Sequence, residues 1–471
     1  MRRRLSTAVL GIALLVSPVA GPALAEEQVL APEIREADLR SHLEYLASDD
    51  MKGRESLSPE AEAASRYIAD RMAAFGLEPL GTDGTWFQPY VIQQPVLEDG
   101  NLLELTIGGE SRAFGVEKDW NPFSVSARGE AEGAVVFAGY GIQAPKRNWD
   151  DYADVDVKGK VVLVMRKNPG WREQQHASFI QKVRVAAKQG AAALLLVNDP
   201  ETTKRAGADR IGHWAAPIGA PAGSSPIPYA FVSQEVAGAI LAPLGTSLET
   251  LEQRLRRDGP QTAPVDASIR VRTALATVED ANTRNVVGYL PGSDPEFADE
   301  FVVLGAHYDH VGLGSYGSLG GRAAAGQIHN GADDNGSGTV TLLELAHWFA
   351  QPANRTRRSM VFLAFSGEER GLLGSLHYVE NPTVPLEDVS AMINMDMVGR
   401  SKNGQIQIGG VGTAVGLQDL VARYNETHGM RVEWDLQGNA PSDSTSFFRK
   451  KIPVLFFFTG LHKDYHLSLI H

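Results

Sequence analysis

FVVLGAHYDH (residues 301–310), GADDNGSGTVTLLELAHWFA (331–350) and RSMVFLAFSG (358–367) follow one another along this chain of 471 residues. The first and third segments contain short apolar runs without alternating polar residues, which is typical of strands buried on both faces. The second segment has apolar residues at helical spacing after a glycine-rich turn. Two buried strands joined through a helix predict an α/β sheet covered by helices.

The same alternation surrounds these segments. Further strands are predicted in NVVGYLPG (285–292), VSAMINMD (389–396), QIQIGGVG (405–412) and PVLFFF (453–458), with a helix at 416–429. Nearer the start, helical spacing predicts two helices between about 34 and 76, and short apolar runs with turn signals predict strands between about 87 and 125.

Residues 130–271 are predicted to form an inserted domain with its own strands and helices. The segments GYGIQAP (139–145), DYADVDVKGKVVLVMR (151–166) and AAKQGAAALLLVND (186–199) resemble the protease-associated domain often found inside secreted peptidases. This resemblance implies a β-rich insert between an N-terminal part at 26–129 and a C-terminal part at 272–471.

Residues 1–25 have the three parts of a secretory signal peptide. Residues 2–4 are arginines, residues 8–19 are mostly apolar, and Ala23-Leu24-Ala25 is a small-x-small end. The apolar run is too short and too interrupted to form a stable membrane span. We therefore expect cleavage near Ala25 and export to the periplasm or the extracellular space.

Composition excludes some partners and some sources of stability. With 57 acidic and 44 basic residues the formal net charge is −13, so nucleic acid is not an expected partner. The sequence contains no cysteine, so the fold must be stabilised by its core without disulfides.

Possible metal ligands follow the predicted strands. His307 ends one strand, and Asp309 projects to the same side of an extended chain, where it could hold the second nitrogen of the imidazole. His310 competes as a ligand, but the extended geometry predicts that it faces the opposite side. Asp333 and Asp334 lie in a turn before a helix, and two successive acids exceed what a helix cap requires. One of them could bridge two cations.

More acids and histidines follow the later strands. Glu368 and Glu369 are adjacent, so their side chains diverge, and one could bind metal while the other faces the attacking water. Asp396 ends an apolar strand, where a buried carboxylate must be paired or liganded. Three histidines near the end of the sequence compete for the role of last ligand: His462, His466 and His471.

Imidazole and carboxylate groups without thiolate suit zinc. The segments GAHYDH, GADDNGSG, FSGEERGLLGS, NMDMVGR, SDSTSF and DYH together resemble the co-catalytic zinc exopeptidases, a family that includes secreted bacterial leucine aminopeptidases, glutamate carboxypeptidase and glutaminyl cyclase. The segment at 42–81 is also similar to the aminopeptidases of that family.

The resemblance implies a zinc exopeptidase fold, with a mixed central sheet flanked by helices, and two Zn²⁺ per chain. It implies that His307 and Asp396 hold one zinc, that Glu369 and His466 hold the other, and that Asp334 bridges them. It also implies three catalytic roles and one backbone feature: Glu368 as general base, Asp309 behind His307, Tyr465 as donor to the oxyanion, and a cis peptide bond at Asp334-Asn335.

The end of the sequence departs from that family. Relatives continue beyond the last histidine with an aspartate and a closing helix, whereas only five residues follow His466 here. We therefore expect His466 to lack the carboxylate that would hold its second nitrogen, and His471 is an alternative ligand.

The resemblance favours an aminopeptidase that acts on peptides with a free N-terminus. Two alternatives are a carboxypeptidase of the same fold, which would need an arginine-lined pocket, and a non-catalytic module that binds peptides. Glutaminyl cyclisation is disfavoured, because such relatives generally lack the inserted domain.

Overall fold

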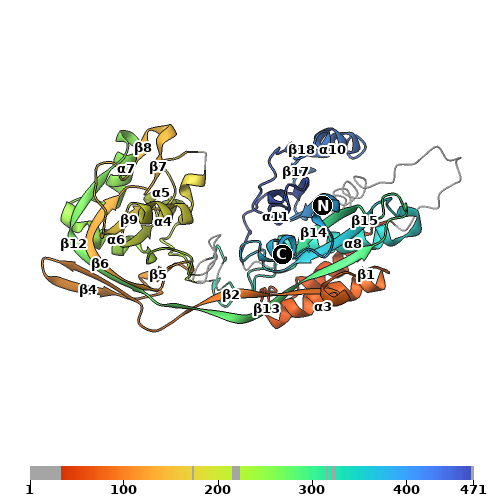
Figure 1. Ribbon diagram of the computed structural model, residues 1–471, viewed down its shortest axis with the longest axis horizontal. Helices are drawn as coiled ribbons and strands as arrows, with labels where there is room; N and C mark the ends of the chain where they lie inside the picture. The colour runs from red at the N-terminus through yellow and green to blue at the C-terminus, as the bar shows by residue number, and fades with distance from the viewer. Residues whose placement is uncertain (1–32, 172–173, 215–222, 315–316, 321–323, 468–471) are drawn as a thin grey trace. The chain divides into compact units, whose positions relative to one another are not determined.

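The computed structural model describes residues 33–171, 174–214, 223–314, 317–320 and 324–467, so the expected signal peptide lies outside the described residues. The chain divides into two compact units: unit 1 is Met1–Ile92 with Ala281–His471, and unit 2 is Gln93–Asp280. Figure 1 labels many of the elements of both units. The domain boundaries at 130 and 271 stay a prediction.

A mixed sheet forms the centre of unit 1. Its strands in spatial order are β1 (Glu78–Pro79), β13 (Leu275–Leu290), β15 (Ser359–Phe365), β14 (Phe301–His307), β16 (Val389–Met395), β19 (Val454–Phe458), β17 (Gln405–Gly409) and β18 (Arg431–Trp434), and β2 (Phe87–Leu97) also pairs with β13. The neighbours β15, β14, β16 and β19 are parallel, whereas β13 and β17 run antiparallel to β15 and β19. The carboxyl ends of four strands therefore meet at one end of the sheet, where α/β folds build ligand sites.

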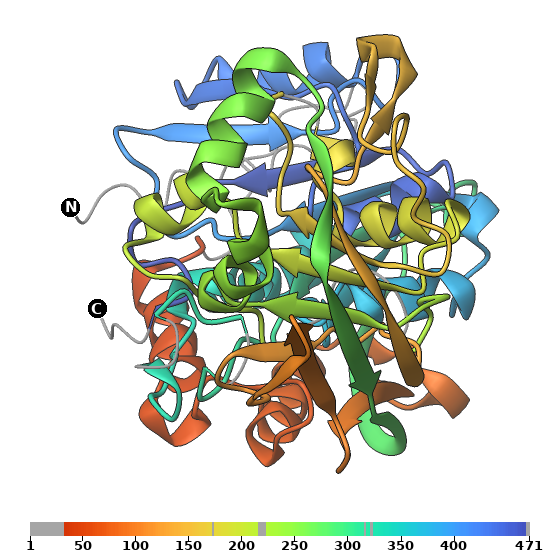
Figure 2. The same ribbon diagram turned by 90° about the vertical axis from the view of Figure 1, so that its left-hand side faces the viewer.

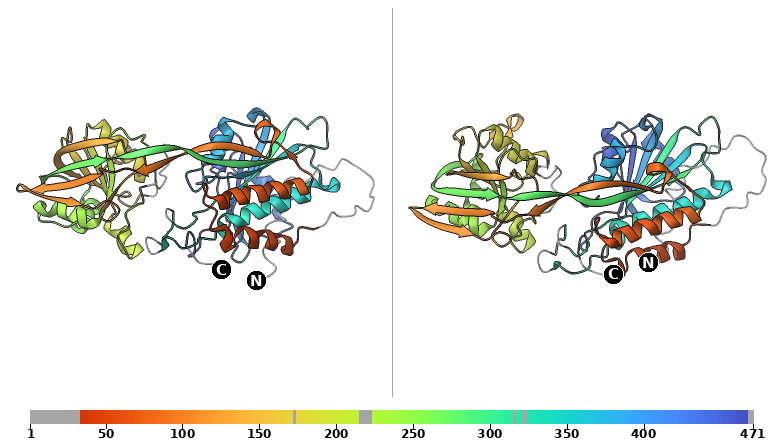
Figure 3. Two further views of the ribbon diagram at one scale, coloured as in Figure 1. Left: turned by 90° about the horizontal axis from the view of Figure 1, so that it is seen from below. Right: turned by 60° about the horizontal axis from the view of Figure 1, so that its bottom comes forward.

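Helices cover both faces of this sheet because its strands are apolar on both. Alternate residues of β15 contribute to two different cores, as the period of a strand requires. One core includes residues of α2 (Glu36–Leu46), α3 (Pro59–Ala74), α8 (Gly338–Ala350) and α10 (Leu417–Asn425), and the other includes residues of α9 (Leu373–Glu380) and α11 (Ser444–Arg449). Both views of Figure 3 show α2 and α3 (red) beside α8 (cyan) along the strands. The predicted α/β fold with a mixed, helix-flanked sheet is confirmed.

The turn before α8 packs tightly against the end of β16. Asn335 Nδ2 donates to the backbone oxygen of Met395 at 2.9 Å, and Gly338 N donates to Asn335 Oδ1 at 2.9 Å. A Cβ on Gly338 would clash with the same oxygen of Met395, so this position requires glycine. The peptide bond Asp334-Asn335 is cis, which confirms the expectation from the resemblance.

Unit 2 is built on a second mixed sheet, whose strands and α7 can be followed in Figure 2. The strand order is β4 (Glu110–Phe114), β3 (Leu102–Ile107), β12 (Thr262–Thr273), β6 (Gly129–Ala138), β9 (Val161–Met165), β10 (Ala193–Val197), β11 (Tyr229–Val232) and β5 (Trp120–Pro122), with a separate pair formed by β7 (Gln143–Ala144) and β8 (Trp149–Asp150). Its helices are α4 (Phe179–Lys188), α5 (Pro200–Ala206), α6 (Gln234–Leu241) and α7 (Leu248–Asp258). The core residues of α4 and those of α6 and α7 belong to different clusters, so helices lie on both faces of this sheet as well.

Among the described residues, no helix combines the length and the apolar character that crossing a bilayer requires.

Unit 2 contains a lysine that is buried almost completely. Lys182 of α4 is 1% exposed, and its Nζ donates to the backbone oxygen of Tyr140. Burial lowers the pKa of Lys182 to about 7, against the attraction of Asp151.

The stability of unit 2 should therefore depend on pH through Lys182. Between pH 7 and about 10.5 the unfolded chain keeps the proton that the folded chain has lost, so folding is favoured more as the pH rises. We predict that wild type gains about 1.4 kcal/mol per pH unit over Lys182→Met in this window. Chemical denaturation of the full chain at several pH values, with unit 2 followed spectroscopically, would measure it. A difference that does not vary with pH would contradict the prediction.

Candidate metal centre

The predicted site residues lie where the parallel strands of unit 1 end. His307 is the last residue of β14, and Asp396 directly follows β16. The pair Glu368-Glu369 lies in the loop after β15, His466 in the loop after β19, and Asp334 in the turn before α8. Their side chains gather into two groups, each of which could hold a metal ion. One group is His307, Glu368 and Asp396, and the other is His310, Asp334, Glu369 and His466.

Asp334 joins the two groups through its two carboxylate oxygens. Oδ1 lies 3.4 Å from Nε2 of His307, and Oδ2 lies 3.0 Å from Nε2 of His466. His307 Nε2 is also 3.5 Å from Oδ1 of Asp396, and His466 Nε2 is 3.3 Å from Oε2 of Glu369. One carboxylate therefore faces both groups at once.

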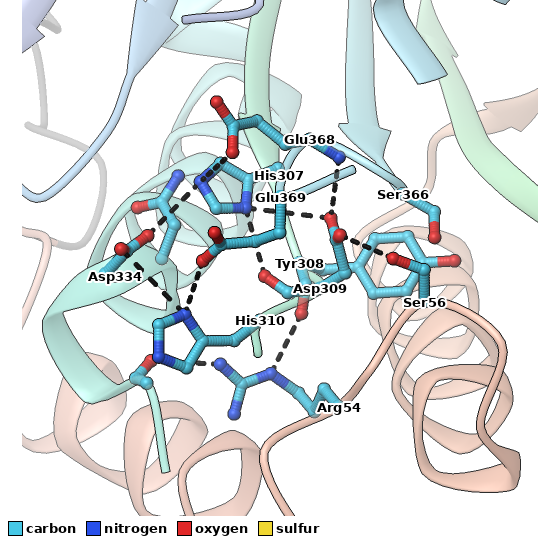
Figure 4. Close-up of polar contacts among 12 residues, drawn as sticks. Arg54, Ser56, His307, Tyr308, Asp309, His310, Asp334, Ser366, Glu368 and Glu369 are labelled. Carbon is cyan, nitrogen blue, oxygen red and sulfur yellow. Dashed lines mark hydrogen bonds and ion pairs between the residues drawn. The ribbon is translucent and has the colours of Figure 1, made fainter. Parts of the chain in front are cut away.

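The adjacent glutamates diverge, as their positions in sequence predict. Oε2 of Glu368 lies 3.8 Å from Nε2 of His307 in the first group, whereas Glu369 belongs to the second (Figure 4). Both side chains are largely buried.

His310 corrects one expectation from the sequence. It was predicted to face away from the site, yet its Nδ1 lies 2.7 Å from Oε1 of Glu369 and 3.8 Å from Oδ2 of Asp334 (Figure 4). The prediction was wrong because β14 ends at His307, and the chain beyond it no longer alternates like a strand.

Asp309 is completely buried beneath His307. Its carboxylate accepts hydrogen bonds from Ser56 Oγ at 2.7 Å and from Glu368 N at 3.3 Å. His307 Nδ1 lies 3.0 Å from the backbone oxygen of Asp309 and 3.7 Å from its Oδ1. The nearer partner of the imidazole is thus the peptide carbonyl, and the carboxylate fixes the segment that follows β15.

His466 is held by a backbone group. Its Nδ1 lies 2.8 Å from the carbonyl oxygen of Gly317, and its ring stacks on Tyr465 with centroids 3.9 Å apart. The partner of Nδ1 is thus a peptide carbonyl. His462 belongs to neither metal group, and His471 lies outside the described residues.

Arg54 lies beneath both groups with its guanidinium buried. It donates to four backbone carbonyls in three segments of the chain: Leu46, Tyr308 at 2.8 Å, Asn330 at 2.8 Å and Gly331 at 2.9 Å. Figure 4 shows the contact with Tyr308. Burial lowers the pKa of Arg54 to about 10, against the attraction of Asp309, Asp334 and Glu369. A cation at this position offsets part of the negative charge of the site.

The crowded charges change the protonation of the site residues. Burial opposes ionisation of Asp334, but hydrogen bonds from His307 and His466 outweigh it and hold the pKa of Asp334 well below its usual range. Burial would lower the pKa of His466, yet the charge of Glu369 and a hydrogen bond to Asp334 raise it to about 11. Burial raises the pKa of Glu368 well above its usual range, and the charge of Asp396 adds to the effect.

Two cavities meet at the site. One has a volume of about 310 Å³, lies against Glu368 and Asp396, and is walled by Phe456 and Phe458, whose rings stack 5.7 Å apart. The other has a volume of about 460 Å³ and lies between α2, α8 and the loop after β19. Both are lined by Asp334 and Tyr465.

Several residues that shape the site were not singled out from the sequence. They are Arg54, Ser56, Arg370, Asp443 and, as a neighbour of Glu369, His310. Arg370 pairs with Glu55 at 2.5 Å, and Asp443 is buried with no hydrogen-bond partner at either oxygen among the described residues. The segment at 42–81 had been recognised only as typical of the family.

The donor set fits zinc. It consists of imidazole and carboxylate groups without thiolate, which is the mixture that zinc takes in hydrolytic sites. Oδ1 of Asp396 is buried and has no hydrogen-bond partner among the described residues, although it faces His307. A buried carboxylate oxygen without a donor calls for a cation.

Comparisons with known proteins agree with these features. Residues 285–469 match peptidase family M28, and residues 128–240 match the PA domain. The chain is 25% identical over 437 residues to an aminopeptidase of Pseudomonas aeruginosa strain UCBPP-PA14, which covers 89% of this chain and 69% of that protein. It is 37% identical over 126 residues to a probable leucine aminopeptidase of Arthroderma otae, which covers 26% of this chain and 30% of that protein.

A solved structure shares the fold. The aminopeptidase from Aneurinibacillus sp. strain AM-1 superposes with a TM-score of 0.58 at 21% identity, covering 92% of this chain and 88% of that chain.

Replacing Arg54 should destabilise unit 1. Arg54→Met would leave buried carbonyls without donors and buried carboxylates without a compensating cation, which costs about 3–5 kcal/mol. Arg54→Lys would restore the charge but not the fork of donors, so its loss should be intermediate. Chemical denaturation that follows unit 1 would measure both variants. Equal stability of wild type and Arg54→Met would contradict the role assigned to the guanidinium.

Proposed function

Since this chain belongs to the zinc exopeptidases of peptidase family M28 and has an inserted PA domain, we propose that it is a two-zinc aminopeptidase that removes residues from the free N-terminus of peptides.

The observation that supports two metals is the position of Asp334. Its two carboxylate oxygens face different groups of donors, at 3.4 Å from His307 and at 3.0 Å from His466. A carboxylate between two cations in this way is typical of co-catalytic sites, in which two metals act on one substrate.

The groups suggest which residues would hold each ion. His307 and Asp396 would hold one zinc, Glu369 and His466 would hold the other, and Asp334 would bridge them. His310 Nδ1 contacts Oε1 of Glu369, whereas Oε2 of the same carboxylate faces His466. We therefore assign His310 the role of orienting the carboxylate of Glu369.

Zinc bound in these groups would supply Lewis acidity and lower the pKa of water towards neutrality. The protein would supply proton transfer and positioning. Glu368 would take a proton from the attacking water and deliver it to the departing amine. Tyr465, beside His466, would donate a hydrogen bond to the oxyanion. Asp309 would hold the segments of His307 and Glu368 in place through its contacts with both.

The cavity beside Glu368 favours an amine over a carboxylate. Its described lining includes the acids Asp334, Glu368, Asp396 and Asp435 and contains neither arginine nor lysine. A carboxypeptidase would need an arginine or lysine there to select the terminal carboxylate, whereas an α-ammonium can pair with Asp435, an acid of this lining to which no metal or proton-transfer role is assigned. The first side chain of the substrate would lie against Phe456 and Phe458.

Export remains part of the proposal. The basic and apolar start of the sequence supports cleavage near Ala25 and export to the periplasm or the extracellular space, where the peptidase would meet peptides outside the cytoplasm.

The function is tested with matched chromogenic substrates. Wild type should cleave leucine p-nitroanilide and leave its N-acetyl derivative intact, because the blocked amine carries no charge for the acidic cavity to attract. Dialysis against a chelator should abolish cleavage, and added Zn²⁺ should restore it. Cleavage of the blocked substrate at a similar rate would rule out aminopeptidase action, and full activity after verified removal of zinc would rule out the metal.

The role of Glu368 is tested by an isosteric change. Glu368→Gln should lower kcat about 10²- to 10⁴-fold, because it removes the proton acceptor. Zinc content measured by atomic emission should remain that of wild type, since Glu368 is not assigned as a ligand. The control is Glu380→Gln, an exposed glutamate at the end of α9, which should match wild type. Near-normal turnover by Glu368→Gln would contradict the mechanism.

A further inference from the structure

Beside the metal groups, the side chains of Arg400, His462, Asp464 and Asp333 form a connected series of contacts. None of these four residues belongs to either metal group. Arg400 NH1 donates to Nδ1 of His462 at 2.8 Å and to Oδ2 of Asp464 at 2.8 Å. On the other side of the imidazole, Nε2 of His462 lies 3.2 Å from Oδ2 of Asp333. Both of these last atoms are buried, and neither has a hydrogen bond to any other described residue, so each faces only the other.

The contacts determine the tautomer of His462. Arginine can only donate, so Nδ1 must accept and carries no proton. The backbone N–H of Asp464 also donates to Nδ1 at 3.2 Å. The proton of the neutral ring is therefore on Nε2, directed at Asp333. Burial and the charge of Arg400 lower the pKa of His462, in keeping with a neutral ring.

Backbone and hydroxyl groups of the same loops hold both ends of this series of contacts. Oδ1 of Asp333 accepts from Gly399 N at 2.9 Å, and the backbone oxygen of Asp333 accepts from Ser337 Oγ at 2.6 Å. Arg400 N donates to Thr459 Oγ1 at 3.3 Å. The contacts thus join three loops that have no sequence continuity.

Each of the three loops holds a proposed metal ligand. Asp333 precedes Asp334, Arg400 lies four residues after Asp396, and His462 lies four residues before His466. A displacement of His462 would be transmitted most directly to His466, because both belong to the loop that follows β19.

We propose that His462 is a positioning residue that, with Asp333, Arg400 and Asp464, fixes the loop of His466 against the other ligand loops and so sets the affinity of the second zinc site. This inference rests on the proposed two-zinc function. His462 was one of the competing ligands in the sequence, and its Nδ1 is instead occupied by Arg400.

The test is a zinc titration of the full chain against a chromophoric chelator, with kcat and KM measured on leucine p-nitroanilide. In His462→Ala, one of two zinc sites should lose about 10- to 100-fold in affinity while the other keeps the wild-type value. At saturating Zn²⁺, kcat should recover while KM stays near wild type. His462→Gln, which keeps an N–H for Asp333, should restore most of the affinity. The control is His428→Ala, a half-buried histidine after α10 that should match wild type.

Arg400→Ala provides a second variant if His462→Ala does not fold. Its side chain is 39% exposed, so its loss should spare the core, and the same single zinc site should weaken. Two sites of wild-type affinity in either variant would overturn the inference, as would equal weakening of both sites. A wild-type chain that binds no zinc would instead overturn the proposed function itself.

Discussion

The site depends on the burial of one cation beneath a group of acids. Five carboxylates converge near the ends of the parallel strands: Asp309, Asp334, Glu368, Glu369 and Asp396. Like charges that are close together and shielded from water repel each other strongly. The guanidinium of Arg54 lies below them. It donates to the carbonyl of Leu46 at the end of α2, to that of Tyr308 just after β14, and to those of Asn330 and Gly331 before α8. The same side chain therefore offsets charge and fixes the segments from which the ligands project.

This arrangement explains why the N-terminal helices belong to the same unit as the strands that follow the insert. Arg54 and Ser56 lie between α2 and α3, and they contact Tyr308 and Asp309 more than 250 residues later in the chain. Glu55, between them, pairs with Arg370, which follows the proposed ligand Glu369. Three consecutive residues thus hold both sides of the site. Unit 1 without this N-terminal segment would lack the contacts that hold the segments of its proposed ligands.

The sequence predicted the sheet and the loops of the proposed ligands because His307 ends an apolar strand, Glu369 and Asp396 follow two others, and parallel strands end together. It could not predict the position of His310, since side-chain direction is defined only while the strand continues, and β14 stops at His307. The sequence also could not predict the partners of Arg54, because most of the carbonyls that it binds are far away in sequence and become neighbours only in the folded chain. His462 was a candidate ligand in the sequence because its partners were unknown. The structure shows that Arg400 donates a hydrogen bond to its Nδ1.

The two halves of the site are held to different degrees. His307 and Asp396 adjoin strands in the middle of the sheet, whose residues are buried on both faces. His466 lies in a loop and has a left-handed backbone with φ of 51°. Its Nδ1 meets the Gly317 carbonyl, its ring stacks on Tyr465, and its Nε2 faces the carboxylates of Asp334 and Glu369. A non-glycine residue in that conformation persists only where its surroundings determine it. Part of the binding energy of a metal at His466 must then be used to order this loop. The half of the site near the end of the chain should for that reason be the one whose occupancy varies first with conditions.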